Sequence, residues 1–197
     1  MNLLLASKSA ARRHMLEAAG VPFEAIEAEL DEAAAKGGLD AAGFDPRGIA
    51  EELAQLKALS VPAPHDCLVL GSDQTLELDD GTMLNKPGSR EDAFDQLRSL
   101  SGRTHWLHSA AVIAEDGEAV WWHSETVELT MRRLGDDFLE AYLDREYEQV
   151  RWSVGGYRIE GLGAQLFERI DGSHFAVLGL PLLPLLGYLR GRGLLKS

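Results

Sequence analysis

The four consecutive apolar residues Cys67-Leu68-Val69-Leu70 constrain the fold more than any other segment of the chain. A strand with one solvated face alternates apolar and polar side chains, whereas a strand that is apolar at every position is buried on both faces. Such a strand needs helices on both faces of its sheet, which is the arrangement of an α/β protein. We therefore predict a buried central strand whose C-terminal end carries Gly71-Ser72-Asp73.

The segments around this strand alternate between strand and helix signals, as α/β proteins do. Leu3-Leu4-Leu5-Ala6 predicts a second buried strand, and Ser9 is a favourable N-cap for a helix that follows it. Asp45-Pro46 is another cap-and-first-turn signal, because proline fits the first helical position. The small, Gly-rich stretch 33–43 is expected to be a mobile connector.

The length of the chain is typical of one domain, so we expect residues 1–197 to form a single domain. Its 19 Lys and Arg against 32 Asp and Glu give a net charge of −13. A surface this acidic repels nucleic-acid backbones and anionic membranes, so we expect neither as a partner. An anionic ligand must therefore enter a local basic site.

The cysteine content and the start of the chain bear on cellular location. Cys67 is the only cysteine, which excludes an internal disulfide and favours a reducing compartment. The apolar residues 1–6 are followed at once by Lys8, which reverses the order of a signal peptide, and they are too few to span a bilayer. We expect a cytoplasmic protein.

Basic residues crowd the first turn of the helix that Ser9 caps. Lys8, Arg12 and Arg13 lie where the helix dipole is already positive, so they cost a little stability unless an anion binds there. Free backbone N–H groups, the hydroxyls of Ser7 and Ser9 and a guanidinium together form a phosphate cradle. The alternative is solvated surface charge, but the acidity of the rest of the chain favours the cradle.

One carboxylate and two lysines are further candidates. Asp73 lies at the C-terminal end of the central strand, where it holds a divalent cation, accepts a proton from water, or only caps a turn. Lys57 lies at the edge of the apolar stripe of its helix, so its ammonium reaches inward to a site or outward to solvent. Lys86 precedes Pro87 and suits either a phosphate oxygen or an ordinary loop.

Further motifs complete a pattern that covers nearly the whole chain. They are Asp31-Glu32, Gln74 directly after Asp73, Leu100-Ser101-Gly102-Arg103-Thr104-His105, Glu160-Gly161-Leu162-Gly163 and Gly179-Leu180-Pro181. In this order, together with residues 5–13 and Lys86-Pro87, they resemble the Maf family of nucleoside triphosphate pyrophosphatases. The resemblance implies a mixed twisted sheet with flanking helices and a central cleft, a Maf/ITPase-like α/β architecture.

The resemblance also implies an enzyme that hydrolyses a nucleoside triphosphate to the monophosphate and pyrophosphate. It makes Asp73 the general base, and it assigns the phosphates to Ser7, Ser9, Arg12, Lys57 and Lys86. Glu32 and Asp73 would hold a divalent metal cation, Mg²⁺ or Mn²⁺. A cytoplasmic location, a homodimer and a link to the restraint of cell division are further implications.

Three positions distinguish the branches of that family, and here they correspond to Ala11, Gln74 and Glu160. Gln74 and Glu160 match the 7-methyl-GTP branch rather than the dTTP/UTP branch, whereas Ala11 matches neither and cannot stack on a base. We therefore expect modified or purine nucleotides such as 7-methyl-GTP as substrates, or a relaxed specificity. The alternatives are a dTTP/UTP pyrophosphatase and a non-catalytic nucleotide sensor that acts in cell division.

Overall fold

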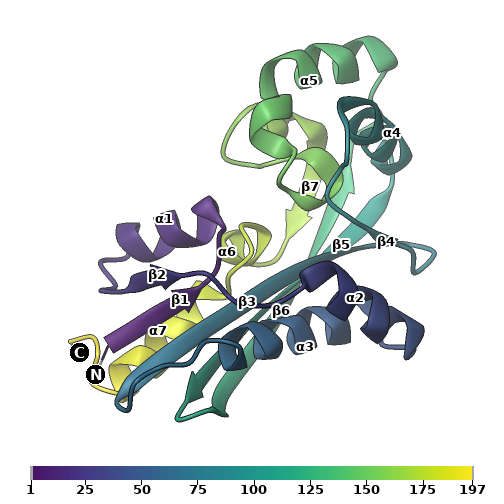
Figure 1. Cartoon of the computed structure of the whole chain (residues 1–197). Helices are drawn as coiled ribbons and strands as arrows, with labels where there is room; N and C mark the ends of the chain where they lie inside the picture. The colour runs from purple at the N-terminus through teal and green to yellow at the C-terminus, as the bar shows by residue number, and fades with distance from the viewer. Residues whose placement is uncertain (1, 197) are drawn as a thin grey trace. The chain divides into compact units, whose positions relative to one another are not determined.

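The structure is a computed structural model that describes residues 2–196 (Figure 1). Its strands are β1 (Asn2–Ala6), β2 (Glu24–Ile26), β3 (Cys67–Leu78), β4 (Met83–Leu84), β5 (Thr104–Glu115), β6 (Glu118–Met131) and β7 (Phe167–Asp171). Its α-helices are α1 (Ala10–Ala18), α2 (Glu32–Ala41), α3 (Pro46–Leu59), α4 (Arg90–Leu100), α5 (Asp136–Val150), α6 (His174–Val177) and α7 (Leu182–Gly191). Two 3₁₀ turns, η1 (Val154–Gly156) and η2 (Leu162–Leu166), precede β7. None of the helices in residues 2–196 combines the length and the apolar character that a membrane span requires.

The chain forms two compact units, each of which is assembled from separate segments. The first contains Met1–Gln74, His108–Glu125 and Ser173–Ser197, and the second contains Thr75–Leu107 and Thr126–Gly172. The long strands β3, β5 and β6 each contribute residues to both units. The helices α1, α2, α3, α6 and α7 belong to the first unit, and α4 and α5 belong to the second.

The sheet is mixed, as the resemblance implied. Its strand order is β2-β1-β3-β5-β6-β7, with β4 paired to β3. The strand β1 is parallel to both β2 and β3, whereas β4 and β7 pair antiparallel with β3 and β6. In the register of β1 and β3, Ala6 pairs with Gly71, so β3 continues beyond the last residue of β1.

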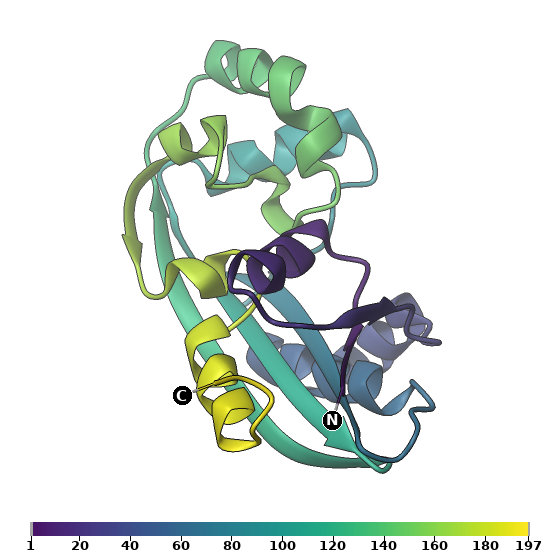
Figure 2. The same ribbon diagram turned by 90° about the vertical axis from the view of Figure 1, so that its left-hand side faces the viewer.

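Within the first unit the strands are covered on both faces, which confirms the prediction from the apolar run at 67–70. One core cluster joins α1 and α7 to alternate residues of three strands: Leu3, Leu5, Leu68, Leu70, Ala111 and Ile113. The other joins α3 to the residues between them: Leu4, Ala6, Cys67, Val69, Ala110 and Val112. On the first face Trp121 of β6 stacks on Tyr188 of α7 with 5.2 Å between ring centroids, and Figure 2 shows α7 in yellow alongside these strands. Cys67 is buried with a free thiol, as expected of a small core residue.

A glycine allows α3 to approach the sheet unusually closely. A Cβ atom built on Gly71 would lie 2.1 Å from the backbone oxygen of Ala54 and 2.5 Å from the backbone nitrogen of Ala58. Contact between heavy atoms this short does not occur, so only a residue without a side chain fits here. The missing Cβ brings the last two turns of α3, which carry Lys57, against β3 at Gly71, two residues before Asp73.

The prediction that residues 33–43 form a mobile connector was wrong, because most of that stretch is the helix α2. Asp31 caps this helix by accepting a hydrogen bond from the backbone nitrogen of Ala34 at 3.0 Å, and Glu32 follows in the first turn. An N-cap and a run of alanines stabilise a helix strongly enough to offset the cost of Gly37 and Gly38. The helix therefore fixes the backbone of Glu32, which a loop would not.

In the second unit, a buried aromatic cluster packs beside α4 and α5. His105 is fully buried, and its Nε2 lies 2.8 Å from the hydroxyl of Tyr157. The Tyr157 ring packs edge-to-face on Phe167 with 4.9 Å between centroids. Burial lowers the pKa of His105 to about 4, so this histidine is neutral at physiological pH.

Candidate functional site

The turn between β1 and α1 holds Arg12 in a buried position. Its Nε donates to the carbonyl oxygen of Gly179 at 2.7 Å, and its Nη1 donates to the carbonyl oxygen of Ser72 at 2.9 Å. Ser72 lies on β3 just beyond the end of β1, so the guanidinium occupies the position where a neighbouring strand would otherwise pair. Among the hydrogen bonds of residues 2–196, none uses Nη2 of Arg12, which leaves that nitrogen for a ligand.

Two serine hydroxyls flank this guanidinium. The Oγ of Ser7 accepts from the backbone nitrogen of Ser9 at 3.2 Å and from Nη1 of Arg12 at 3.4 Å. The Oγ of Ser9 caps α1 by accepting from the backbone nitrogen of Arg12, as predicted. Both oxygens act as acceptors in these contacts, so each hydroxyl proton can be donated to an anionic oxygen.

Lys57, Asp73 and Glu32 form a cluster on the face of β3 that α3 covers. The Nζ of Lys57 lies 2.5 Å from Oδ1 of Asp73 and 3.1 Å from Oε2 of Glu32. The Lys57 side chain is 5% exposed, so of the two orientations that the sequence left open the inward one is observed, whereas half of the Glu32 side chain is in solvent. One buried ammonium therefore orients both carboxylates.

The charges of this cluster also act on Arg12. Burial lowers the pKa of the Arg12 guanidinium, while the carboxylates of Asp73 and Glu32 raise it. The guanidinium stays protonated in any case, because arginine does not deprotonate in proteins. Two cations and two carboxylates thus lie together at the C-terminal end of β1 and beside β3, where α/β folds bind their ligands.

Three neighbouring residues to which the sequence analysis assigned no role, Ser72, Gly179 and Ser109, are hydrogen-bonded to the site or to Gln74 beside it. The Oγ of Ser72 donates to the carbonyl oxygen of Gly179 at 3.0 Å, and that oxygen also accepts from Arg12. Gly179 has a φ of 93°, in the left-handed region that favours glycine. Ser109, a buried polar residue of β5 that directly precedes the apolar residues 110–114, contacts Gln74. Because its neighbour His108 is polar too, no sequence signal distinguishes Ser109.

Two of the predicted specificity residues also belong to the first unit. Ala11 is half-buried in the first turn of α1, where it offers a methyl group only. Gln74 follows Asp73 on β3, and its side chain contacts α6 rather than α3. Successive residues of a strand point to opposite faces, so Asp73 and Gln74 lie on the two sides of β3.

Lys86 and Glu160 belong to the second unit. Lys86 is exposed in the loop between β4 and α4, and Glu160 is exposed just before η2. The carboxylate of Glu160 contributes to raising the pKa of Tyr142, although burial of that hydroxyl is the main cause. The assigned roles of these two residues stay predictions.

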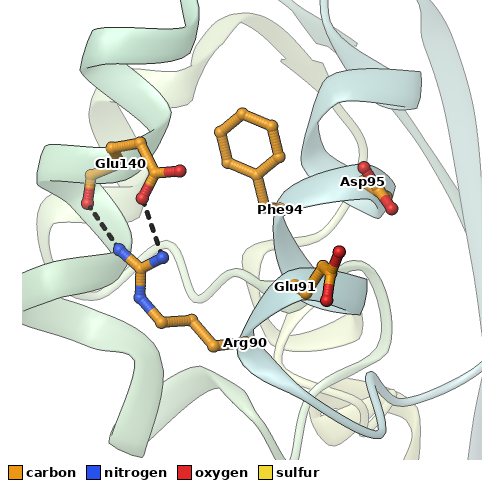
Figure 3. Close-up of a pocket in the computed structure, with 5 residues that line it drawn as sticks. All are labelled: Arg90, Glu91, Phe94, Asp95 and Glu140. Atoms are coloured by element: carbon orange, nitrogen blue, oxygen red, sulfur yellow. Dashed lines mark hydrogen bonds and ion pairs between the residues drawn. The ribbon is translucent and has the colours of Figure 1, made fainter.

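A cavity of about 490 Å³ in the second unit has the wrong charge for a polyphosphate. It lies between α4 and α5 and is lined by Arg90, Glu91, Phe94, Asp95 and Glu140. Figure 3 shows the Arg90 guanidinium turned to Glu140, whose carboxylate lies 2.7 Å from Nη1. Three carboxylates against one cation that is already paired would repel a triphosphate.

The carboxylates of Glu32 and Asp73 are compatible with a divalent cation that takes its other ligands from water and substrate. In residues 2–196 no three His, Cys, Asp or Glu side chains are grouped closely enough to hold a metal ion by themselves. Mg²⁺ is commonly bound through one or two carboxylates together with water and substrate phosphates. Glu32 and Asp73, already drawn together by Lys57, fit that requirement.

The fold and the cluster define an α/β protein that gathers two cations and two carboxylates beyond the C-terminal end of β1. A family model described as Maf-like protein matches residues 2–192. The chain therefore belongs to the Maf-like protein family.

Individual relatives match over nearly their whole length. The 7-methyl-GTP pyrophosphatase of Rhizobium etli is 49% identical over 192 residues, which cover 97% of this chain and 96% of the relative. Nucleoside triphosphate pyrophosphatase 1 of Jannaschia sp. is 50% identical over 194 residues, which cover 98% and 97%. The nucleoside triphosphate pyrophosphatase of Sphingopyxis alaskensis is 46% identical over 195 residues, which cover 98% of both chains.

Proposed function

We propose that this protein is a nucleoside triphosphate pyrophosphatase that converts a triphosphate and water to the monophosphate and pyrophosphate. The observation that carries the proposal is the cluster of Arg12, Lys57 and Asp73 in a chain whose relatives have that name. A substrate with several negative charges requires local cations in a protein whose net charge is −13. Arg12 and Lys57 supply them in a buried site.

The phosphate groups bind at the start of α1. In this proposal the phosphate oxygens accept hydrogen bonds from Nη2 of Arg12, from the hydroxyls of Ser7 and Ser9, and from the N–H groups of the first helical turn. Lys86 stays a predicted phosphate ligand. These donors stabilise the charge that develops on the transferred phosphoryl group, which is the main contribution of a protein to such reactions.

Asp73 acts as the general base. It accepts a proton from a water molecule whose oxygen forms the new bond to the α-phosphorus, and the bond from that phosphorus to the bridging oxygen of pyrophosphate breaks. Lys57 holds the Asp73 carboxylate through Oδ1, which leaves Oδ2 to receive the proton. Glu32 and Asp73 would hold Mg²⁺ or Mn²⁺, which polarises the phosphoryl oxygens when bound.

The substrate class follows from three positions. Gln74 contacts the base in this proposal, Ala11 leaves space where a larger residue would stack, and Glu160 stays a predicted specificity residue. We infer a modified or purine nucleotide, with 7-methyl-GTP as the first candidate because one relative has that name. A cytoplasmic location and a homodimer remain predictions.

The test is pyrophosphate release from ATP, GTP, CTP, UTP, dTTP and 7-methyl-GTP, with Mg²⁺ and then with Mn²⁺. Asp73→Asn should abolish release while its circular dichroism spectrum stays that of the wild type. Asp137→Asn, an exposed change in the first turn of α5, is the matched control and should be fully active. Full activity of Asp73→Asn would refute the assignment of the base.

A different outcome would favour the non-catalytic alternative. If the wild type releases no pyrophosphate from any of the six nucleotides with either metal, the same nucleotides should be titrated by calorimetry. Binding without product formation would replace the enzyme by a nucleotide sensor, and the ranking of affinities would then identify the ligand.

A further inference from the structure

The carboxamide of Gln74 is held by three oxygens that surround its nitrogen. Nε2 lies 2.9 Å from Oγ of Ser109, 2.9 Å from the carbonyl oxygen of Ala176 and 3.1 Å from the carbonyl oxygen of Val177. Carbonyl oxygens only accept hydrogen bonds, so the amide nitrogen and not the amide oxygen must face them. The chemistry of the contacts therefore fixes which way the carboxamide points.

Ser109 completes this arrangement from the neighbouring strand β5. It is fully buried, and its hydroxyl donates to the carbonyl oxygen of Ala176 at 2.6 Å. Since its proton is used there, its lone pairs are available to the N–H of Gln74. The two carbonyl oxygens lie at the C-terminal end of α6, and that of Ala176 also accepts from the backbone nitrogen of Gly179 at 3.0 Å.

These contacts occupy both N–H donors of Gln74 and leave its amide oxygen available to a ligand. Gln74 is half-buried, and in the part of the chain that the structure describes no hydrogen bond reaches its Oε1. The residue lies next to Asp73 on the stretch of β3 that extends beyond the end of β1. A ligand bound there meets Gln74 as an acceptor and not as a donor.

We infer that Ser109 is a positioning residue which, with the last carbonyl groups of α6, makes Gln74 a hydrogen-bond acceptor for the substrate base. The inference rests on the proposed function, in which Gln74 contacts the base. An acceptor at this point selects bases that present a ring N–H, as guanine and hypoxanthine do at N1. It disfavours adenine, whose N1 is itself an acceptor.

A comparison of ITP with ATP tests the inference, because their bases have nearly the same size. The two bases differ in the hydrogen-bonding groups at N1 and C6, so the ratio of their kcat/KM values reports the polarity of the contact. We expect the wild type to prefer ITP by about tenfold, the value of one hydrogen bond gained against one mismatched pair of acceptors. Equal kcat/KM values for ITP and ATP would overturn the inference.

Two variants test which residues cause the preference for ITP. Ser109→Ala leaves Nε2 two of its three acceptors and should lower the ITP preference about fivefold. Gln74→Met, which keeps the length of the side chain and removes its polar atoms, should abolish the preference. Ser99→Ala is the matched control, because the Ser99 hydroxyl donates to the backbone of α4 in the second unit, and it should keep the wild-type ratio.

The ratio separates positioning from a merely structural role, since a destabilised enzyme loses activity on both nucleotides equally. An unchanged ratio in Ser109→Ala would refute the role of Ser109. If Ser109→Ala does not fold by circular dichroism, an unchanged ratio in Gln74→Met would refute the inference instead. A wild type that releases no pyrophosphate from any triphosphate would overturn the proposed function itself, whereas an active wild type without ITP preference would overturn the inference alone.

Discussion

Gly71→Ala tests whether the close approach of α3 to β3 builds the site. The new Cβ would lie 2.1 Å from the backbone oxygen of Ala54, more than an ångström inside ordinary van der Waals contact. A flexible side chain could move aside, but here the nearest atoms belong to helix backbone. The helix α3 must therefore shift away from the strand by about 1 Å.

Two effects of this shift can be estimated. Overpacking a well-packed core costs about 1–3 kcal/mol, and we expect the upper end because backbone cannot rearrange locally. For a protein of this size that corresponds to a fall in Tm of about 10 °C. The shift also carries Lys57 away from Asp73, which now lie 2.5 Å apart, and a misplacement of about 1 Å costs about 100-fold in rate.

Thermal unfolding followed by circular dichroism and pyrophosphate release from the best nucleotide measure the two effects separately. Gly187→Ala is the matched control, since Gly187 lies inside α7 with no atom within 4 Å of the added Cβ. It should be as active as the wild type and more stable by about 1 kcal/mol. A Gly71→Ala protein with wild-type Tm and activity would refute our account of how α3 positions Lys57.

Three further predictions concern other parts of the chain. His105, whose pKa falls to about 4 on burial, binds fewer protons when folded than when unfolded, so stability should fall by about 3 kcal/mol between pH 6.5 and pH 4. Urea unfolding should show a flatter pH dependence for His105→Gln. Arg12→Lys cannot reach both Gly179 and Ser72, and urea unfolding should show a loss of about 2 kcal/mol. Gly38→Ala in α2 should raise the free energy of unfolding by about 0.5–1 kcal/mol in the same assay, because a Cβ there meets no other atom.

Sequence patterns sufficed for the elements whose signals are local. The apolar run at 67–70 predicted a strand covered on both faces, and the caps Ser9 and Asp45 lie where the helices α1 and α3 begin. The stretch 33–43 was misjudged because its glycines outweighed its alanines and the Asp31 cap. In so short a segment the glycines disfavour a helix while the cap and the alanines favour one, so no single signal is decisive.

The candidate site, like the fold, has some features that local sequence patterns predict and others that depend on tertiary contacts. The sequence by itself determined the identities of its charged residues, because an apolar run that leads into Asp73 and a basic helix start are local patterns. The prediction that the strand ends at Asp73 was wrong, because β3 continues to Leu78 and pairs there with β4. Only the tertiary structure decided that Lys57 reaches Asp73 and that Ser109 faces Gln74. These contacts join residues far apart in the chain, and they depend on how closely α3 and α6 pack against the sheet, which no local pattern encodes.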